Sequence, residues 1–375
     1  MANIIVGMSG GVDSSVAALL LKRAGHEVTG IFMNNWEEKD ECGVCTSEPD
    51  WADVRRVCYA IGIRCYSVNF AREYRERVFA HFLEEYRRGR TPNPDVLCNR
   101  EIKFGVFLDL AEKLGADRLA TGHFARLDES GGQYRLLRAR DETKDQTYFL
   151  YMLNQRALSR AMFPVGNLSK AEIRQIARDA GLPVSEKKDS TGVCFIGERN
   201  FKQFLSGYLP AQPGEIVTVD GRIIGRHDGL MYYTPGQRRG LGIGGSGDRR
   251  RWFVVEKDLK RNLLIVDQGE DSPLLFSDSA DGSQCSWLAG HPPVEDDVPL
   301  RCRVRLRHRQ PLQDCTIKLK GDSVHMDFDT PQRAVTAGQS AVFYDGEVCL
   351  GGAIVDTAEK FDAMEHAQNA GQADD

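Results

Sequence analysis

The sequence predicts an α/β protein with an N-terminal parallel-sheet domain, followed by a small central β domain and a C-terminal β-barrel. Three observations predict this fold class. Short apolar runs alternate with helical patterns from residue 4 to residue 180, which is typical of a parallel sheet with crossover helices. After Tyr208, proline and glycine punctuate short β-rich runs. After Pro273, apolar and polar residues alternate with period two, which predicts a small barrel.

The first part of the chain alternates regularly between the two element types. The pattern predicts strands at residues 4–7, 27–33, 64–70 and 117–121, and helices at 14–24, 50–61, 73–88, 102–114 and 169–180. The last helix opens with a capping box, because Glu172 follows Ser169 by three residues, and Gly181 ends it. The segment "KDQTYFLYML" (144–153) predicts an aromatic-rich helix behind three polar residues.

Composition excludes several classes of protein. The chain has 375 residues, 41% hydrophobic and 27% charged, and no apolar run approaches the roughly 20 residues of a membrane span. The few residues before the first motif do not form a signal peptide, so we expect a cytoplasmic protein with no membrane partner. Ten cysteines in such a chain are core residues, metal ligands or catalytic thiols. A net charge of −5 means that a nucleic-acid partner would need local basic patches.

The stretch "GMSGGVDS" (7–14) joins the first strand to the first helix and predicts an anion site. Gly10 and Gly11 let backbone N–H groups approach a phosphate, and the helix N-terminus adds partial positive charge. Asp13 is unusual in a phosphate cradle unless Mg²⁺ lies between it and the phosphates. The lysine of the G-x-x-x-x-G-K-[ST] pattern is absent, which favours cleavage of ATP between its α- and β-phosphates. The alternative is an ordinary strand-to-helix turn.

Two cysteines lie in distinctive surroundings. Cys98, in "GRTPNPDVLCNREIKF" (89–104), comes just before a helix expected to start near Glu101, where the helix dipole favours a thiolate. Cys194, in "KKDSTGVCFIGERNF" (187–201), follows two lysines that would have the same effect. Taken alone, a cysteine in either setting is more often structural.

Two further motifs point to ligands. In "ATGHFAR" (120–126), a predicted strand ends where ligands bind in open parallel sheets, so Gly122 could admit an adenosine and His123 would lie at the site. The alternative is that His123 is a polar residue whose hydrogen bonds are made within the protein and that it binds no ligand. In "RCRVRLRHRQ" (301–310), strand geometry places five arginines on one face, which favours a polyanion over a solvated strand face. They are Arg301, Arg303, Arg305, Arg307 and Arg309.

The pair Cys42-x-x-Cys45 could be half of a zinc site. No second half occurs at ligand spacing, so we expect a surface loop and no protein-bound metal.

"SGGVDS" resembles the PP-loop of the N-type ATP pyrophosphatases. Several further blocks in order resemble one family of that superfamily, the bacterial tRNA-specific 2-thiouridylases, over residues 1 to about 354. The blocks are "GMSGGVDS", "GRTPNPDVLCN", "ATGHF", "KDQTYFLY", "KDSTGVCFIGERNF", "YLPAQPG", "GLMYYTPGQRRGLGIGG" and "GQSAVFYDGEVCLGG". The resemblance implies a PP-loop ATP pyrophosphatase domain at 1–205, a central β-rich domain at 206–275, a tRNA-binding β-barrel at 276–358 and a disordered tail at 359–375.

The family also implies site residues and a reaction. The reaction adenylates the C2 oxygen of the wobble uridine of tRNA and then replaces it with sulfur, giving 2-thiouridine, AMP and pyrophosphate. Cys194 would carry a persulfide, received from a sulfur-donor protein or a cysteine desulfurase relay, with Cys98 as its partner thiol and Asp95 as a further catalytic residue. ATP, with Mg²⁺, would be bound by Gly7, Met8, Ser9, Gly10, Gly11, Val12, Asp13, Ser14, Met33 and Gly122. The target base would meet Asn93, Pro94 and Asp95, and the rest of the tRNA would meet His123, Lys144, Asp145, Gln146, Arg307, His308 and Gln339.

Two other functions stay open at this point. A synthetase of the same loop class would adenylate a small metabolite and would need neither the cysteine pair nor the basic strand. An RNA-binding module without catalysis would not need the intact loop. Exchange of pyrophosphate into ATP, with and without tRNA, separates the three.

Overall fold

The computed structural model describes residues 1–37, 47–188, 201–244 and 250–360. Cys42, Cys45, Cys194 and the residues after 360 lie outside this part of the chain. Among the described residues, no helix is long and apolar enough to cross a membrane.

The N-terminal domain contains a parallel sheet with the strand order β3-β2-β1-β4-β7. Its strands are β1 (Asn3–Met8), β2 (Glu27–Asn34), β3 (Arg64–Asn69), β4 (Arg118–Ala120) and β7 (Ala161–Met162). Along β1, Ile4 and Val6 belong to the core on one face and Ile5 to the core on the other. Burial on both faces explains the nearly continuous apolar run of this strand and confirms the predicted α/β class.

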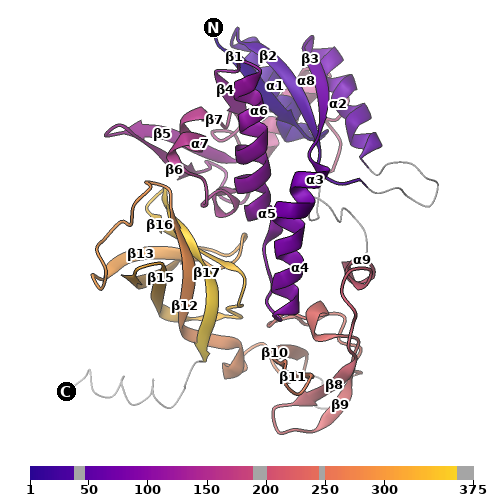
Figure 1. Ribbon diagram of the computed structural model, residues 1–375, viewed down its shortest axis with the longest axis vertical. Helices are drawn as coiled ribbons and strands as arrows, with labels where there is room; N and C mark the ends of the chain where they lie inside the picture. Colours follow the sequence, from indigo (N-terminus) through magenta and orange to yellow (C-terminus); the bar gives the residue numbers. More distant parts are fainter. Residues whose placement is uncertain (38–46, 189–200, 245–249, 361–375) are drawn as a thin grey trace.

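Helices cover both faces of this sheet (Figure 1). Helices α1 (Val12–Arg23) and α2 (Glu48–Ile61) pack on one face, and α6 (Phe107–Lys113) packs on the other. Helix α8 (Lys170–Asp179) packs against α1. Its predicted capping box is confirmed: Ser169 Oγ accepts from Glu172 N at 3.2 Å, and Glu172 Oε2 accepts from Ser169 N at 2.7 Å.

Two predicted helices are divided differently in the structure. The helix expected at 73–88 consists of α3 (Ala71–Tyr74), the π-helical η1 (Arg75–Phe79) and α4 (Ala80–Arg87). The helix expected from about Glu101 starts earlier, with α5 (Pro94–Leu97), and continues through the π-helical η2 (Cys98–Val106) into α6. The predicted start is wrong because Asn93 caps the helix, its Oδ1 accepting from Asp95 N at 3.2 Å, with Pro94 at the first helical position.

The prediction of an aromatic-rich helix directly after the polar residues 144–146 is also wrong. This segment contains only the 3₁₀ turn η3 (Thr147–Phe149), and helix α7 (Gln155–Arg160) follows it. Tyr148 and Tyr151 are both fully buried, and Tyr148 Oη donates to Leu306 O at 3.2 Å and to Ser340 O at 3.0 Å. These barrel carbonyls hold the segment in its non-helical form.

The C-terminal strands form a closed six-stranded barrel, in the order β12-β15-β14-β13-β16-β17 with β17 paired back to β12. They are β12 (Phe276–Trp287), β13 (Leu300–Arg305), β14 (Gln313–Lys320), β15 (Ser323–Arg333), β16 (Ser340–Asp345) and β17 (Val348–Lys360). The sequence pattern did not predict the hairpin of β5 (Ala125–Ser130) and β6 (Gln133–Arg138). This hairpin belongs to the N-terminal part of the sequence but extends the sheet of the barrel, because β6 pairs with β17 through Leu137 and Val348.

The central domain is a four-stranded sheet in the order β10-β11-β8-β9 (Figure 1). Its strands are β8 (Gly214–Thr218), β9 (Ile223–His227), β10 (Trp252–Asp258) and β11 (Leu263–Gln268), with the 3₁₀ turn η4 (Leu230–Tyr232) after β9 and η5 (Pro273–Leu275) leading to the barrel. Helix α9 (Phe201–Ser206) precedes this sheet and packs with η1 and α4 of the N-terminal domain in one aromatic cluster.

Candidate active site

The glycine loop between β1 and α1 has the backbone of an anion site. Gly10 has a φ of +74°, and a Cβ there would lie 2.7 Å from Asp50 O, so the position requires glycine. Gly11 is the N-cap of α1, and among the described residues no side chain caps this helix end. The first N–H groups of α1 therefore point out of the helix without an internal partner, which is the arrangement that binds phosphate.

The loop serines stabilise the turn itself. Ser9 N donates to Ser14 Oγ at 3.2 Å, the two hydroxyls lie 3.1 Å apart, and Ser14 Oγ donates to Gly11 O at 3.2 Å. The family resemblance implies that both serines bind ATP. In the structure they already hold the loop in shape, so a phosphate would meet a preformed turn.

Two lysines from distant parts of the sequence flank the loop. Lys170, at the start of α8, places Nζ 2.6 Å from Asp13 Oδ1. Lys187 Nζ lies 3.1 Å from Gly10 O and 2.7 Å from both Asp50 Oδ1 and Asp53 Oδ2. The positive charge that the loop's own sequence lacks is thus supplied from elsewhere. Sequence reasoning missed Lys170, and it assigned Lys187 only to the surroundings of Cys194.

The carboxyl ends of three neighbouring strands surround this loop. Strand β1 lies between β2 and β4, so Met33 at the end of β2 and Gly122 just after β4 are on either side of it. A Cβ at Gly122 would lie 2.6 Å from Ser14 N, so the glycine is needed for close contact with the first turn of α1. The contact between Gly122 and an adenosine stays a prediction. At Gly7, a Cβ would lie 3.2 Å from Phe107 and 3.7 Å from Met33.

His123 is held by two neighbours in this region. Its Nδ1 lies 2.7 Å from Thr121 Oγ1, and its Nε2 lies 3.4 Å from Lys103 Nζ. Burial, and then the positive charge of Lys103, hold the pKa of His123 well below its usual value. The ring is therefore neutral at pH 7. An ammonium can only donate, so Nε2 accepts and Nδ1 carries the proton.

The residues expected to meet the target base lie at the start of the α5–η2 helix. Asn93 caps it, Pro94 and Asp95 form its first turn, and Cys98 lies one turn further on with no exposed surface. Cys98 belongs to the aromatic cluster around Trp36 and Phe79. It is thus inside a helix, and the expectation that it precedes one is wrong. Its expected partner, Cys194, lies outside the described residues.

The polar residues at 144–146 connect the N-terminal domain to the barrel. Asp145 is 1% exposed, and its Oδ2 lies 2.8 Å from Nη1 of the buried Arg305. Its Oδ1 also accepts from Ala139 N at 3.1 Å. Gln146 exchanges hydrogen bonds of 2.9 Å with the backbone of Phe124, and Lys144 is half-buried beside them.

The remaining predicted tRNA contacts also lie where domains meet. Arg307 donates to the backbone carbonyls of Pro235 and Ala334 at 3.2 and 3.0 Å. His308 Nε2 lies 3.1 Å from the backbone oxygen of Asp145, and its ring centroid is 4.4 Å from that of Phe149. Gln339 Nε2 donates to Thr91 O at 2.7 Å.

The single arginine face predicted for 301–309 is wrong. Strand β13 ends at Arg305, so the last two arginines are not part of it. Arg301 is exposed and paired with Asp329, and Arg303 Nη2 donates to Gly346 O at 3.1 Å. Arg305 has the same strand parity but is only 4% exposed, because the segment around Asp145 covers the barrel there.

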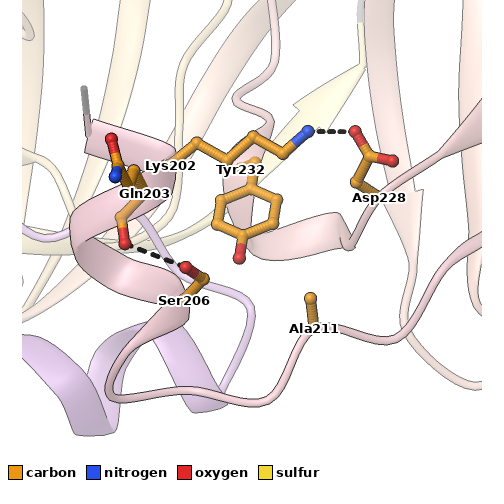
Figure 2. Close-up of a pocket in the computed structure, with 6 residues that line it drawn as sticks. All are labelled: Lys202, Gln203, Ser206, Ala211, Asp228 and Tyr232. Atoms are coloured by element: carbon orange, nitrogen blue, oxygen red, sulfur yellow. Dashed lines mark hydrogen bonds and ion pairs between the residues drawn. The ribbon is translucent and has the colours of Figure 1, made fainter.

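A hollow in the described residues outside the loop region is less suited to nucleotide chemistry. A pocket of about 390 Å³ lies between α9 and the central domain. Figure 2 shows its lining, with Lys202 reaching across Tyr232 to an ion pair with Asp228. Helix α9 and the central domain lie away from the carboxyl edge of the parallel sheet (Figure 1), so we place the candidate active site at the loop.

Fold and site together define a three-domain protein whose α/β domain presents a pyrophosphate-type glycine loop at the edge of a parallel sheet. Family models match each domain in turn: a tRNA methyl transferase HUP domain at residues 2–198, a tRNA methyl transferase PRC-barrel domain at 202–268, and an aminomethyltransferase beta-barrel domain at 277–355. The chain belongs to the tRNA-specific 2-thiouridylase family.

Two relatives illustrate the similarity. The chain is 60% identical over 354 residues to "tRNA-specific 2-thiouridylase MnmA" of Alkaliphilus oremlandii, covering 94% of this chain and 96% of the relative. It is 57% identical over 358 residues to the protein of the same name from Bacillus subtilis, covering 95% of each. A solved 4-thiouridine synthetase–RNA complex with bound ATP is 18% identical, with a TM-score of 0.36 over 55% of this chain and 49% of that chain, which is too low to support an argument.

Proposed function

We propose that this chain is a tRNA-uridine 2-sulfurtransferase that uses ATP to convert the wobble uridine of tRNA to 2-thiouridine. The observation that carries the proposal is the loop at Gly10 and Gly11, with an uncapped helix end among the described residues and Lys170 and Lys187 beside it. Such a site suits the binding of the pyrophosphate leaving group, and family membership supplies the substrate class.

In the first step, the C2 oxygen of the uracil would attack the α-phosphorus of ATP, and pyrophosphate would leave. The loop N–H groups and Lys170 would stabilise the negative charge that develops on the leaving group. Asp13 is 32% exposed beside the loop and offers the hard oxygen donor that Mg²⁺ prefers, so it would be the residue that holds Mg²⁺. When bound, Mg²⁺ would neutralise phosphate charge.

In the second step, a persulfide on Cys194 would attack C2 through its terminal sulfur, and AMP would leave. A thiolate of Cys98 would then attack the Cys194 sulfur of the S–S bond, which releases 2-thiouridine and leaves a Cys98–Cys194 disulfide. A reductant of the thiol class must reopen that disulfide before a sulfur-donor protein or a cysteine desulfurase relay reloads Cys194. Asp95, three residues before Cys98, lies at the same helix start.

Binding of tRNA would place the wobble base at Asn93, Pro94 and Asp95, after the base leaves the anticodon stack at a cost of a few kcal/mol. Contacts along the seam between the N-terminal domain and the barrel would hold the rest of the tRNA. The residues concerned are His123, Lys144, Asp145, Gln146, Arg307, His308 and Gln339. Asp145 is buried in the structure, so its contribution would be to hold this seam together.

The direct test follows ATP consumption and the modified nucleoside together. With tRNA and a persulfide donor, we expect one AMP and one pyrophosphate for each 2-thiouridine found by mass spectrometry of the digested tRNA. Without tRNA, AMP formation should fall to background. AMP formation that needs a small metabolite in place of tRNA would make the chain a metabolite synthetase, and tRNA binding without AMP formation would make it a binding module.

A further inference from the structure

Lys187 makes three contacts that the proposed reaction does not use. Its ammonium group has three hydrogens, and three acceptors surround it: Gly10 O at 3.1 Å, Asp50 Oδ1 at 2.7 Å and Asp53 Oδ2 at 2.7 Å. The full hydrogen-bonding capacity of the group is therefore directed at protein atoms.

Two of these acceptors belong to the start of α2, and the helix presses on the loop at the same place. Asp50 and Asp53 lie in the first two turns of α2, and the backbone oxygen of Asp50 leaves no room for a Cβ at Gly10. Burial would raise the pKa of Asp53, but hydrogen bonds from Lys187 and Arg56 lower it, so the carboxylate stays charged. Burial likewise opposes the charge on Lys187, but both carboxylates raise its pKa.

The contact with Gly10 O sets the direction of a loop N–H group. The carbonyl of Gly10 and the N–H of Gly11 belong to one planar trans peptide, so they point to opposite sides of it. An ammonium that holds the carbonyl on the α2 side turns the Gly11 N–H away from α2. Within the described part of the chain, this N–H has only a long contact of 3.4 Å to Ser9 Oγ, so it can be donated to a stronger acceptor such as a phosphate oxygen.

We propose that Lys187 is a positioning residue for ATP, which orients the Gly10–Gly11 peptide toward the pyrophosphate by anchoring it to Asp50 and Asp53. The inference rests on the proposed function in taking ATP as the ligand of the loop. It differs from the alternative that Lys187 itself binds phosphate, because in that case the two carboxylates would compete with ATP for the lysine.

The test compares Lys187→Met with Lys188→Met, a matched control at the adjacent exposed lysine. ATP affinity is measured by titration calorimetry without tRNA, and the KM for ATP is measured from tRNA-dependent AMP formation. We expect Lys187→Met to weaken both by at least about tenfold, as for the loss of a charged hydrogen bond, and Lys188→Met to change neither by more than about twofold.

The variant Asp50→Asn distinguishes a positioning role of Lys187 from direct phosphate binding by Lys187. It also provides a test of the proposal if Lys187→Met does not fold. Positioning predicts that Asp50→Asn weakens ATP binding in the same direction and that the double variant is no worse than Lys187→Met. Lys187→Arg, which can still bridge a carbonyl and carboxylates, should retain most of the affinity.

Tighter ATP binding in Asp50→Asn would overturn the inference and make Lys187 a phosphate ligand. Unchanged ATP affinity in Lys187→Met would also overturn it. A different result would separate the two proposals. If the unmodified protein binds ATP, Lys187→Met weakens that binding, and yet no AMP forms with tRNA, the proposed function is contradicted and the positioning role of Lys187 is retained.

Discussion

Replacing Arg305 by methionine should destabilise the junction between the N-terminal domain and the barrel. The side chain of Arg305 is 5% exposed and that of Asp145 is fully buried, with 2.8 Å between Nη1 and Oδ2. The guanidinium group also lies 5.6 Å from the ring centroid of Tyr344. Methionine would fill much of the same volume but would leave the carboxylate of Asp145 buried without its counter-ion.

The expected cost follows from that unpaired charge. Removing one partner of a buried ion pair typically costs about 3–5 kcal/mol. Asp145 would keep the hydrogen bonds from Ala139 N and from the hydroxyl of Thr147, the latter at 2.9 and 3.0 Å, so we expect the lower end of this range, about 3 kcal/mol. Changing Asp145 to asparagine as well removes the charge, so the double variant should lose clearly less than the sum of the two single variants.

Urea unfolding followed by tryptophan fluorescence measures these effects, with Trp287 as a reporter within the barrel. Arg303→Met is the matched control, because Arg303 lies on the same strand and makes one contact of 3.1 Å to a backbone carbonyl. It should cost less than about 1 kcal/mol. A loss below about 1 kcal/mol in Arg305→Met, or strict additivity with Asp145→Asn, would refute the assignment of a coupled buried pair.

Three further predictions concern the reaction and the RNA. Asp13→Ala should abolish tRNA-dependent AMP formation while tRNA affinity, measured by filter binding, stays within about twofold; an equal loss of both in a folded variant would contradict this division. Cys194→Ser should form AMP but neither accept sulfur nor make 2-thiouridine, whereas Cys98→Ser should load sulfur on Cys194 and stall at its transfer. Mass spectrometry of the trapped protein shows which cysteine carries the persulfide, and a persulfide on another cysteine would exclude the mechanism. Replacing Arg301 and Arg303 by alanine should lower the salt slope of tRNA binding by about one for each lost phosphate contact, and an unchanged slope would make these residues part of a solvated face.

Elements with strong local signals were predicted from the sequence. The parallel sheet follows from apolar runs buried on both faces, as for Ile4, Ile5 and Val6 in β1. The capping box at Ser169 and Glu172 was confirmed because both of its partners lie within one turn of the chain. In such cases the residues within one strand or one helical turn are sufficient to predict the element.

Elements that depend on distant partners were not predicted. The segment around Tyr148 has an aromatic pattern compatible with a helix, but hydrogen bonds to carbonyls of Leu306 and Ser340 stabilise another conformation. The hairpin β5–β6 is completed by strand β17, more than 200 residues later in the sequence. No local pattern encodes such a partner, because the paired strands are far apart in the sequence.

The same limit explains how the site acquires its charge. The loop sequence raised the question of a missing lysine, and no rule about the loop could locate a substitute 157 or 177 residues away. The structure brings Lys170 to Asp13, in the first turn of α1. It brings Lys187 to Gly10, just before α1, and to Asp50, in the first turn of α2. A lysine within the loop would sit beside the phosphate in every state of the enzyme. Lysines supplied by other segments are held by carboxylates, Lys170 by Asp13 and Lys187 by Asp50 and Asp53, so the charge at the loop depends on how α8 and α2 pack against it.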